Sequence, residues 1–110
     1  MSEYFIEEGY KDPAAVMTGC VLEEHLRQLC ELNKIEVTFE KDYKFITKKA
    51  NLLNSELAKK NVYGKLDSKN IIAWLDQRNS AAHGKFDNYN KEQVHTMLNG
   101  VTEFIARVKI

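Results

Sequence analysis

A short run in the second half of the chain, RNSAAH, brings together three polar side chains that can act on a phosphodiester: Arg78, Asn79 and His83. A guanidinium is a fixed fork of donors that matches phosphate oxygens. Histidine exchanges a proton near neutral pH, and an amide can orient either the imidazole or a substrate hydroxyl. The set suits cleavage without a metal, in which His83 activates a ribose 2′-hydroxyl or protonates the leaving oxygen. Arg78 would then steady the charge that develops on phosphorus.

The same residues interrupt the apolar stripe of a predicted helix. At about 100° per residue, Arg78 and Asn79 fall inside the arc that contains Leu75, and His83 falls at its edge. Asn79 and His83 are also four residues apart, so their side chains can touch. Polar groups directed at a core are costly unless they are paired. Either these residues are satisfied structurally, with Arg78 paired to a carboxylate, or they form a site.

An earlier predicted helix has a second polar intrusion, formed by Glu23 and Arg27. Their spacing of four residues allows a salt bridge beside the core, worth a few tenths of a kcal/mol. The alternative is a supporting role, in which Glu23 positions Arg78 or His83 and Arg27 adds positive charge to the cleft. The sequence leaves both interpretations open.

The elements that must position these residues are predicted to be helical nearly throughout. The chain of 110 residues is the size of one domain, its hydrophobic fraction is 44%, and no linker or repeat divides it. We expect a short helix over 2–10, and a helix over 13–32 with Asp12 as its N-cap and Pro13 as its first residue. A third helix is expected over 47–61. The motif helix follows, capped by Asp67 or Ser68 and ended by Gly84, and a capping box of Asn90 with Gln93 starts the last helix. The segment IEVTFEKDYKF alternates weakly, which would suit a short strand, but a loop or an irregular turn is preferred because no second strand offers itself as a partner. The prediction is an all-α bundle of four to five helices.

RNSAAH resembles the R-x4-6-H motif of the HEPN superfamily, including the polar residue that often follows the arginine. The resemblance extends to GCVLEEHLRQLCE and to LNSELAKKNVYGKLDSKNIIAWLDQRNSAAHG, and so covers most of the chain. It implies one HEPN-like domain over 1–110, similar to a module found at the C-terminus of longer bacterial proteins. It also implies a metal-independent endoribonuclease of toxin–antitoxin or abortive-infection systems, with Arg78, Asn79 and His83 as catalytic residues.

The resemblance further implies partners. Two HEPN copies typically pair through the motif helix and build one composite cleft, and an antitoxin or an additional domain can accompany them. Many HEPN-like domains have lost catalysis, so the alternative is a module that dimerises or binds a nucleotide or RNA. A third class, a plain helical adaptor, would require Arg78 and His83 to be sealed inside a monomer core.

Charge restricts the partners. Lys and Arg together number 16, as do Asp and Glu, so the formal net charge is +0. This argues against binding of nucleic acid or anionic lipid through a broad positively charged surface, but it allows a local phosphate-binding site. For RNA, the expected contacts are Lys85, Lys48 and Lys49.

Cysteine and histidine spacing addresses redox state and metals. Cys20 and Cys30 lie roughly 15 Å apart along one predicted helix, too far for a disulfide, so we expect two reduced packing residues. His25 and His95 are expected to flank the fold, and no metal-ligand spacing appears, so no metal or cofactor is predicted. With no apolar run of about 18 residues and an acidic N-terminus, the prediction is a cytoplasmic protein without a membrane segment.

Overall fold

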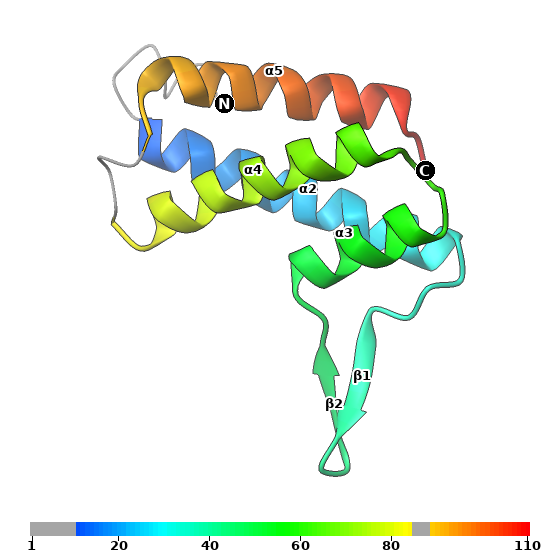
Figure 1. The fold of residues 1–110 in the computed structure, drawn as a ribbon. Coiled ribbons are helices and arrows are strands. Elements are labelled where there is room, and N and C mark those ends of the chain that lie inside the picture. Colours follow the sequence, from blue (N-terminus) through cyan, green and yellow to red (C-terminus); the bar gives the residue numbers. More distant parts are fainter. Residues whose placement is uncertain (1–10, 85–88) are drawn as a thin grey trace.

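The computed structural model of the chain describes residues 11–84 and 89–110. Within them lie four helices and one two-stranded sheet (Figure 1): α2 (Lys11–Leu32), β1 (Thr38–Lys41), β2 (Lys44–Thr47), α3 (Ala50–Lys59), α4 (Lys65–Ala82) and α5 (Lys91–Arg107). The expected all-α bundle is therefore confirmed as a helical bundle, with a small hairpin added to it. The short helix expected over 2–10 lies outside the described residues.

Helix α2 is the centre of the bundle, and the other three helices pack against it (Figure 1). Its inner face repeats every three to four residues, and Leu22, Leu26 and Leu29 are at most 1% exposed. Phe104 of α5 is fully buried and meets the rings of His25 and Tyr63 edge-on, at centroid distances of 5.8 and 5.3 Å. These contacts fix α2 against α5 and leave one side of α2 for α3 and α4.

The helix ends agree with the sequence at some positions and differ at others. Gly84 has a φ of 72° just past the end of α4, as its predicted capping role requires. The predicted capping box of Asn90 and Gln93 is present at the start of α5. The predicted cap of α4 was wrong: the helix starts one turn earlier, after Gly64, and Asp67 instead binds Arg107 of α5. Because α2 begins at Lys11, Asp12 lies in its first turn and is not the N-cap.

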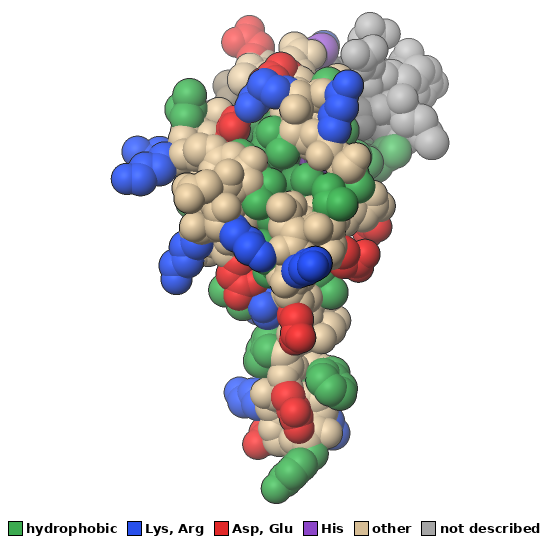
Figure 2. All heavy atoms as spheres, turned by 90° about the vertical axis from the view of Figure 1, so that its right-hand side faces the viewer, with side chains coloured by type: hydrophobic (Ala, Val, Ile, Leu, Met, Phe, Trp, Pro, Cys, Tyr) green, Lys and Arg blue, Asp and Glu red, His purple; other side chains and the backbone are tan. Residues whose placement is uncertain are grey.

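The preference for a loop in IEVTFEKDYKF was also wrong, because this segment contains β1 and the start of β2, the two strands of a hairpin. Strands β1 and β2 pair antiparallel, with Phe39 opposite Ile46 and Lys41 opposite Lys44. The turn consists of Asp42 and Tyr43, both with positive φ, 52° and 64°. Two positive φ values are the requirement of a type I′ turn. The hairpin projects away from the bundle (Figure 1), and Figure 2 shows hydrophobic side chains along it at the bottom of the view.

Two side chains lie elsewhere than expected. His25 is not a flanking residue: it is 7% exposed, and its Nε2 lies 2.6 Å from the carbonyl oxygen of Val108, which ties α2 to the end of α5. Both cysteines are free thiols, but only Cys30 is buried, whereas Cys20 is exposed and does not pack in the core. Among the described residues, no helix is long and apolar enough to cross a bilayer.

Candidate active site

Three separate segments surround one cleft of about 610 Å³. They are the middle of α2, the β2–α3 connection and the C-terminal half of α4. The cleft is lined by seven of the eight residues proposed from the sequence: Glu23, Arg27, Lys48, Lys49, Arg78, Asn79 and His83. The eighth, Lys85, lies outside the described residues. The fold thus gathers residues that are up to 60 positions apart in the chain, from Glu23 to His83.

Glu23 holds the arginines of two helices together. Its Oε2 accepts a hydrogen bond of 2.7 Å from Nη2 of Arg27, one turn along α2. Its Oε1 accepts one of 2.9 Å from Nη1 of Arg78 on α4. Both interpretations of Glu23 therefore apply, because the intrahelical salt bridge and the contact with Arg78 exist together. Arg27 continues the network by donating to the carbonyl oxygen of Lys48 at 3.1 Å.

The two arginines keep Glu23 ionised. Burial by itself raises the pKa of this carboxyl, but the hydrogen bonds and charges of Arg27 and Arg78 outweigh burial and bring the pKa below its usual 4.5. The three side chains are between 18% and 26% exposed, so solvent reaches them from the cleft. Two positive charges and one negative charge leave a net positive group at the wall of the cleft.

Gly19 explains how Arg78 reaches Glu23. A Cβ placed on Gly19 would lie 2.1 Å from Cγ and 2.6 Å from Cβ of Arg78, closer than real Cβ atoms come to a neighbour. The stem of Arg78 therefore crosses α2 in the space that glycine leaves, one turn before Glu23. Gly19 is not among the residues proposed from the sequence. The signal that could have found it is that glycine inside a helix costs about 1 kcal/mol relative to alanine, so such a position usually has a packing reason.

Asn79 and His83 lie on the open side of the cleft. Both side chains are exposed, and Asn79 Oδ1 accepts a hydrogen bond of 3.0 Å from Nε of Arg78. No side-chain hydrogen bond joins Asn79 to His83 in the part of the chain that is described, so the contact allowed by their spacing is not made. His83 follows the last residue of α4, where its backbone N–H donates to the carbonyl of Asn79 at 3.0 Å. Its imidazole can therefore reach a bound molecule without unfolding the helix.

The two lysines at the β2–α3 connection differ in availability. Lys48 is 12% exposed and donates to both oxygens of Glu56 at 3.0 Å, so its charge is already paired. Lys49 is exposed, and its side chain has no hydrogen-bond partner among residues 11–84 and 89–110. Lys49 is thus the better placed of the two for a phosphate. The described residues contain no group of three or more His, Cys, Asp or Glu placed to hold a metal ion.

Comparison of the chain with protein-family models, with curated proteins and with solved structures finds no match in any of the three. The resemblance to the HEPN superfamily therefore depends on the residues of the motif and on the segments quoted with it.

Proposed function

We propose that this cleft is the active site of a metal-independent endoribonuclease of HEPN type, acting in a toxin–antitoxin or phage-defence setting. One observation carries the proposal: Arg78, Asn79 and His83 open into a single cleft together with Glu23 and a positive lining. The plain-adaptor alternative required Arg78 and His83 to be sealed inside the core, whereas His83 is exposed and Arg78 is 18% exposed.

In the proposed reaction, His83 takes the proton of a ribose 2′-hydroxyl, and the 2′-oxygen attacks the adjacent phosphorus. The P–O2′ bond forms, the P–O5′ bond breaks, a solvent water gives a proton to the leaving 5′-oxygen, and His83 returns its proton to solvent. Arg78 donates to the phosphate oxygens, where charge increases in the transition state. Glu23 and Asn79 hold the guanidinium by two of its nitrogens, and Nη2 has no partner among the described residues, so this nitrogen is available to a phosphate.

The test is incubation of the pure protein with mixed RNA and with DNA in excess chelator. We expect fragments with 2′,3′-cyclic phosphate and 5′-hydroxyl ends from RNA, no cleavage of DNA, and no effect of the chelator. His83→Ala should abolish cleavage while the midpoint of thermal unfolding stays within about 1 °C, because the side chain is exposed and makes no side-chain hydrogen bond within the described residues. Equal cleavage by wild type and His83→Ala would place the activity elsewhere.

The second candidate is a non-catalytic HEPN-like module that dimerises or binds RNA. The ion pair between Glu23 and Arg78 favours it, because part of the arginine charge is already compensated in the free protein. RNA binding without cleavage by the wild type, under all the conditions above, would select this candidate.

A further inference from the structure

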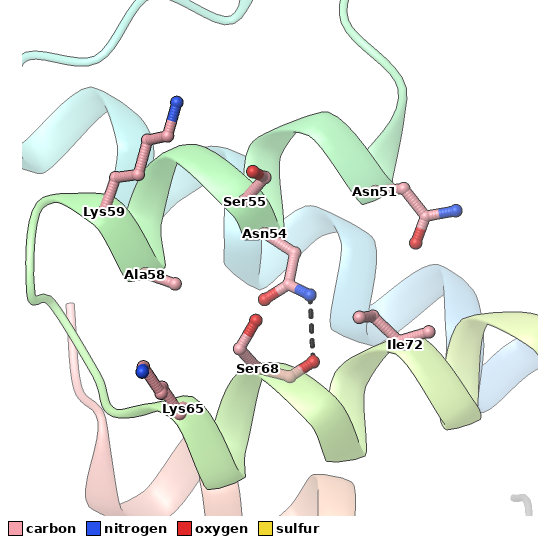
Figure 3. Close-up of a pocket in the computed structure, with 8 residues that line it drawn as sticks. All are labelled: Asn51, Asn54, Ser55, Ala58, Lys59, Lys65, Ser68 and Ile72. Atoms are coloured by element: carbon pink, nitrogen blue, oxygen red, sulfur yellow. Dashed lines mark hydrogen bonds between the residues drawn. The ribbon is translucent and has the colours of Figure 1, made fainter.

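A second hollow adjoins the cleft along the groove between α3 and α4 (Figure 3). Its volume is about 500 Å³, and Asn51 lines both the hollow and the cleft, so the two meet at this residue. Figure 3 shows Asn51 at one end of the groove and Lys65 at the other, where the chain turns from α3 into α4. The groove therefore extends the candidate active site along α4, away from His83.

The described residues that line this groove include no carboxylate, in a chain with as many acidic as basic residues. Lys59 and Lys65 flank its far end, and both are exposed. Neither ammonium group has a hydrogen-bond or ion-pair partner in the described ranges. With Lys49, which lines the cleft, three lysines without a partner among the described residues border one channel formed by the two adjoining hollows. Among the described residues, Glu23 is the only acid in its lining, and two arginines bind it. Such a channel is complementary to a linear polyanion.

The surface of the groove is mostly apolar, and uncharged polar groups lie within it. Asn54 is 1% exposed and is held by Tyr63, which donates to it at 2.6 Å, and by the carbonyl of Ser68, to which it donates at 3.0 Å. Asn51 and Ser55 are exposed, and their side chains make no hydrogen bond within the described residues. Amides and hydroxyls both donate and accept, as recognition of base edges and of a 2′-hydroxyl requires. The exposed side chain of Ile72 contributes apolar surface against which a base can pack.

We propose that the α3–α4 groove binds the single-stranded RNA next to the cleavage point, with Lys59 and Lys65 on its phosphates. This inference rests on the proposed function and adds a substrate class to it. Along α4, the distance from Asn79 to Lys65 is roughly 20 Å. At the spacing of about 3.4 Å per nucleotide in a stacked strand, this length holds about six nucleotides, and fewer in an extended strand. Affinity should therefore increase with RNA length until the groove is filled.

The experiment measures binding of fluorescent single-stranded RNA to the His83→Ala protein, which is expected to leave the RNA uncut. The oligonucleotides are about two and about eight nucleotides long. We expect the longer RNA to bind more tightly. Adding Lys59→Ala and Lys65→Ala should weaken binding of the longer RNA roughly tenfold at low salt and leave binding of the shorter RNA unchanged. Two lost phosphate contacts should also reduce the slope of log affinity against log salt by about 1.4.

The matched control is His83→Ala with Lys34→Ala and Lys91→Ala, which removes two exposed lysines that do not line the groove. It should bind both RNAs like its parent. Unchanged binding of the longer RNA by the Lys59/Lys65 variant, or an equal loss in the control, would overturn the groove proposal even if the wild type cleaves RNA. If no RNA binds and none is cleaved, the proposed function itself fails and this inference with it.

Discussion

Glu23 joins arginines from two helices, so its carboxylate determines how much of the charge of Arg78 faces a substrate. In the free protein, Arg78 donates to Glu23 and to Asn79, which fixes the plane of its guanidinium. A bound phosphate would share this arginine with Glu23 and would not have to order it. Pre-ordering of this kind lowers the entropic cost of binding while leaving a net positive charge from the two arginines.

Replacement of Glu23 by Gln should cost stability as well as activity. The neutral amide loses two charge-assisted hydrogen bonds at a partly exposed position, and we expect about 1–2 kcal/mol at neutral pH. The folded state lowers the pKa of Glu23 below 4.5, so this stabilisation is present above that pH and is lost as the pH falls through the folded-state pKa. Urea unfolding of both proteins over a pH series should show a difference that shrinks below pH 4.5.

Glu24→Gln is the matched control, since Glu24 is the exposed neighbour and its only side-chain hydrogen bond among the described residues is with Gln28 of its own helix. Its difference from the wild type should be near zero at every pH. A Glu23→Gln difference that keeps its full size in acid would mean that the charge of Glu23 does not stabilise the fold.

At the residue scale, the sequence predicted which residues line the site better than it predicted which of them pair with each other. Spacing alone placed Arg78 in an apolar arc, and a buried charge is costly without a partner, so a carboxylate partner was one of the two possibilities that the sequence left open. Which carboxylate it would be depends on how α2 crosses α4, and that crossing is set by contacts distant in sequence. Lys48 shows the same limit, because its pairing with Glu56 follows from the turn into α3 and not from local spacing.

Among the elements, the crossing of α2 and α4 depends on Gly19. Gly19→Ala would gain about 1 kcal/mol of helix propensity but would force a methyl group into the stem of Arg78. Overpacking typically costs about 1–3 kcal/mol, so we expect a net loss of stability and a displaced Arg78 with reduced activity. Thermal unfolding and the cleavage assay measure the two effects.

Gly64→Ser provides the control for an added Cβ, because a Cβ there would meet no atom of the described residues within 4 Å beyond the glycine and its two chain neighbours. Gly64 is the N-cap of α4 without a side-chain cap, and a serine hydroxyl can accept from the first turn. Stability should stay equal or increase slightly, and activity should not change. Loss of activity in Gly64→Ser comparable to that in Gly19→Ala would show that the assay responds to any change near α4.

The hairpin contains strain that can be removed. Tyr43 has a φ of 64° and is 98% exposed, so its side chain stabilises the fold little while its backbone is in the left-handed region. Tyr43→Gly should stabilise the hairpin by about 1 kcal/mol. We expect slower amide hydrogen exchange in β1 and β2 and an unchanged midpoint of global unfolding. Faster exchange would mean that the tyrosine ring holds the turn.

The hairpin also shows why element prediction failed there. Asp42 and Tyr43 lack the glycine that usually marks a tight turn, and the exposed strands carry no clean alternation of buried and solvent-facing residues. The long helices were predictable because Leu22, Leu26 and Leu29 on α2, and the buried residues of α5, repeat at helical spacing. Pairing of two short strands depends on a turn that the sequence marks weakly.

At the scale of the whole molecule, Arg78 does not need a second chain to balance its charge. It lies on the apolar arc of α4, and Glu23 of the same chain pairs with it. Dimerisation through α4 remains a prediction of the family resemblance. The outer face of α4 offers the small, exposed Ala73, at which a second helix could approach closely.

If two copies share the motif helix, a charged side chain at Ala73 should separate them without unfolding either one. We expect Ala73→Glu to be monomeric at tens of micromolar by analytical ultracentrifugation. If the cleft is composite, RNA cleavage should fall in proportion to the loss of dimer. Ala106→Glu makes the same substitution on the exposed face of α5 and should leave assembly and activity unchanged. A wild-type protein that is monomeric at that concentration and still cleaves RNA would contradict the composite site, because each chain would then hold a complete cleft built from α2, α3 and α4.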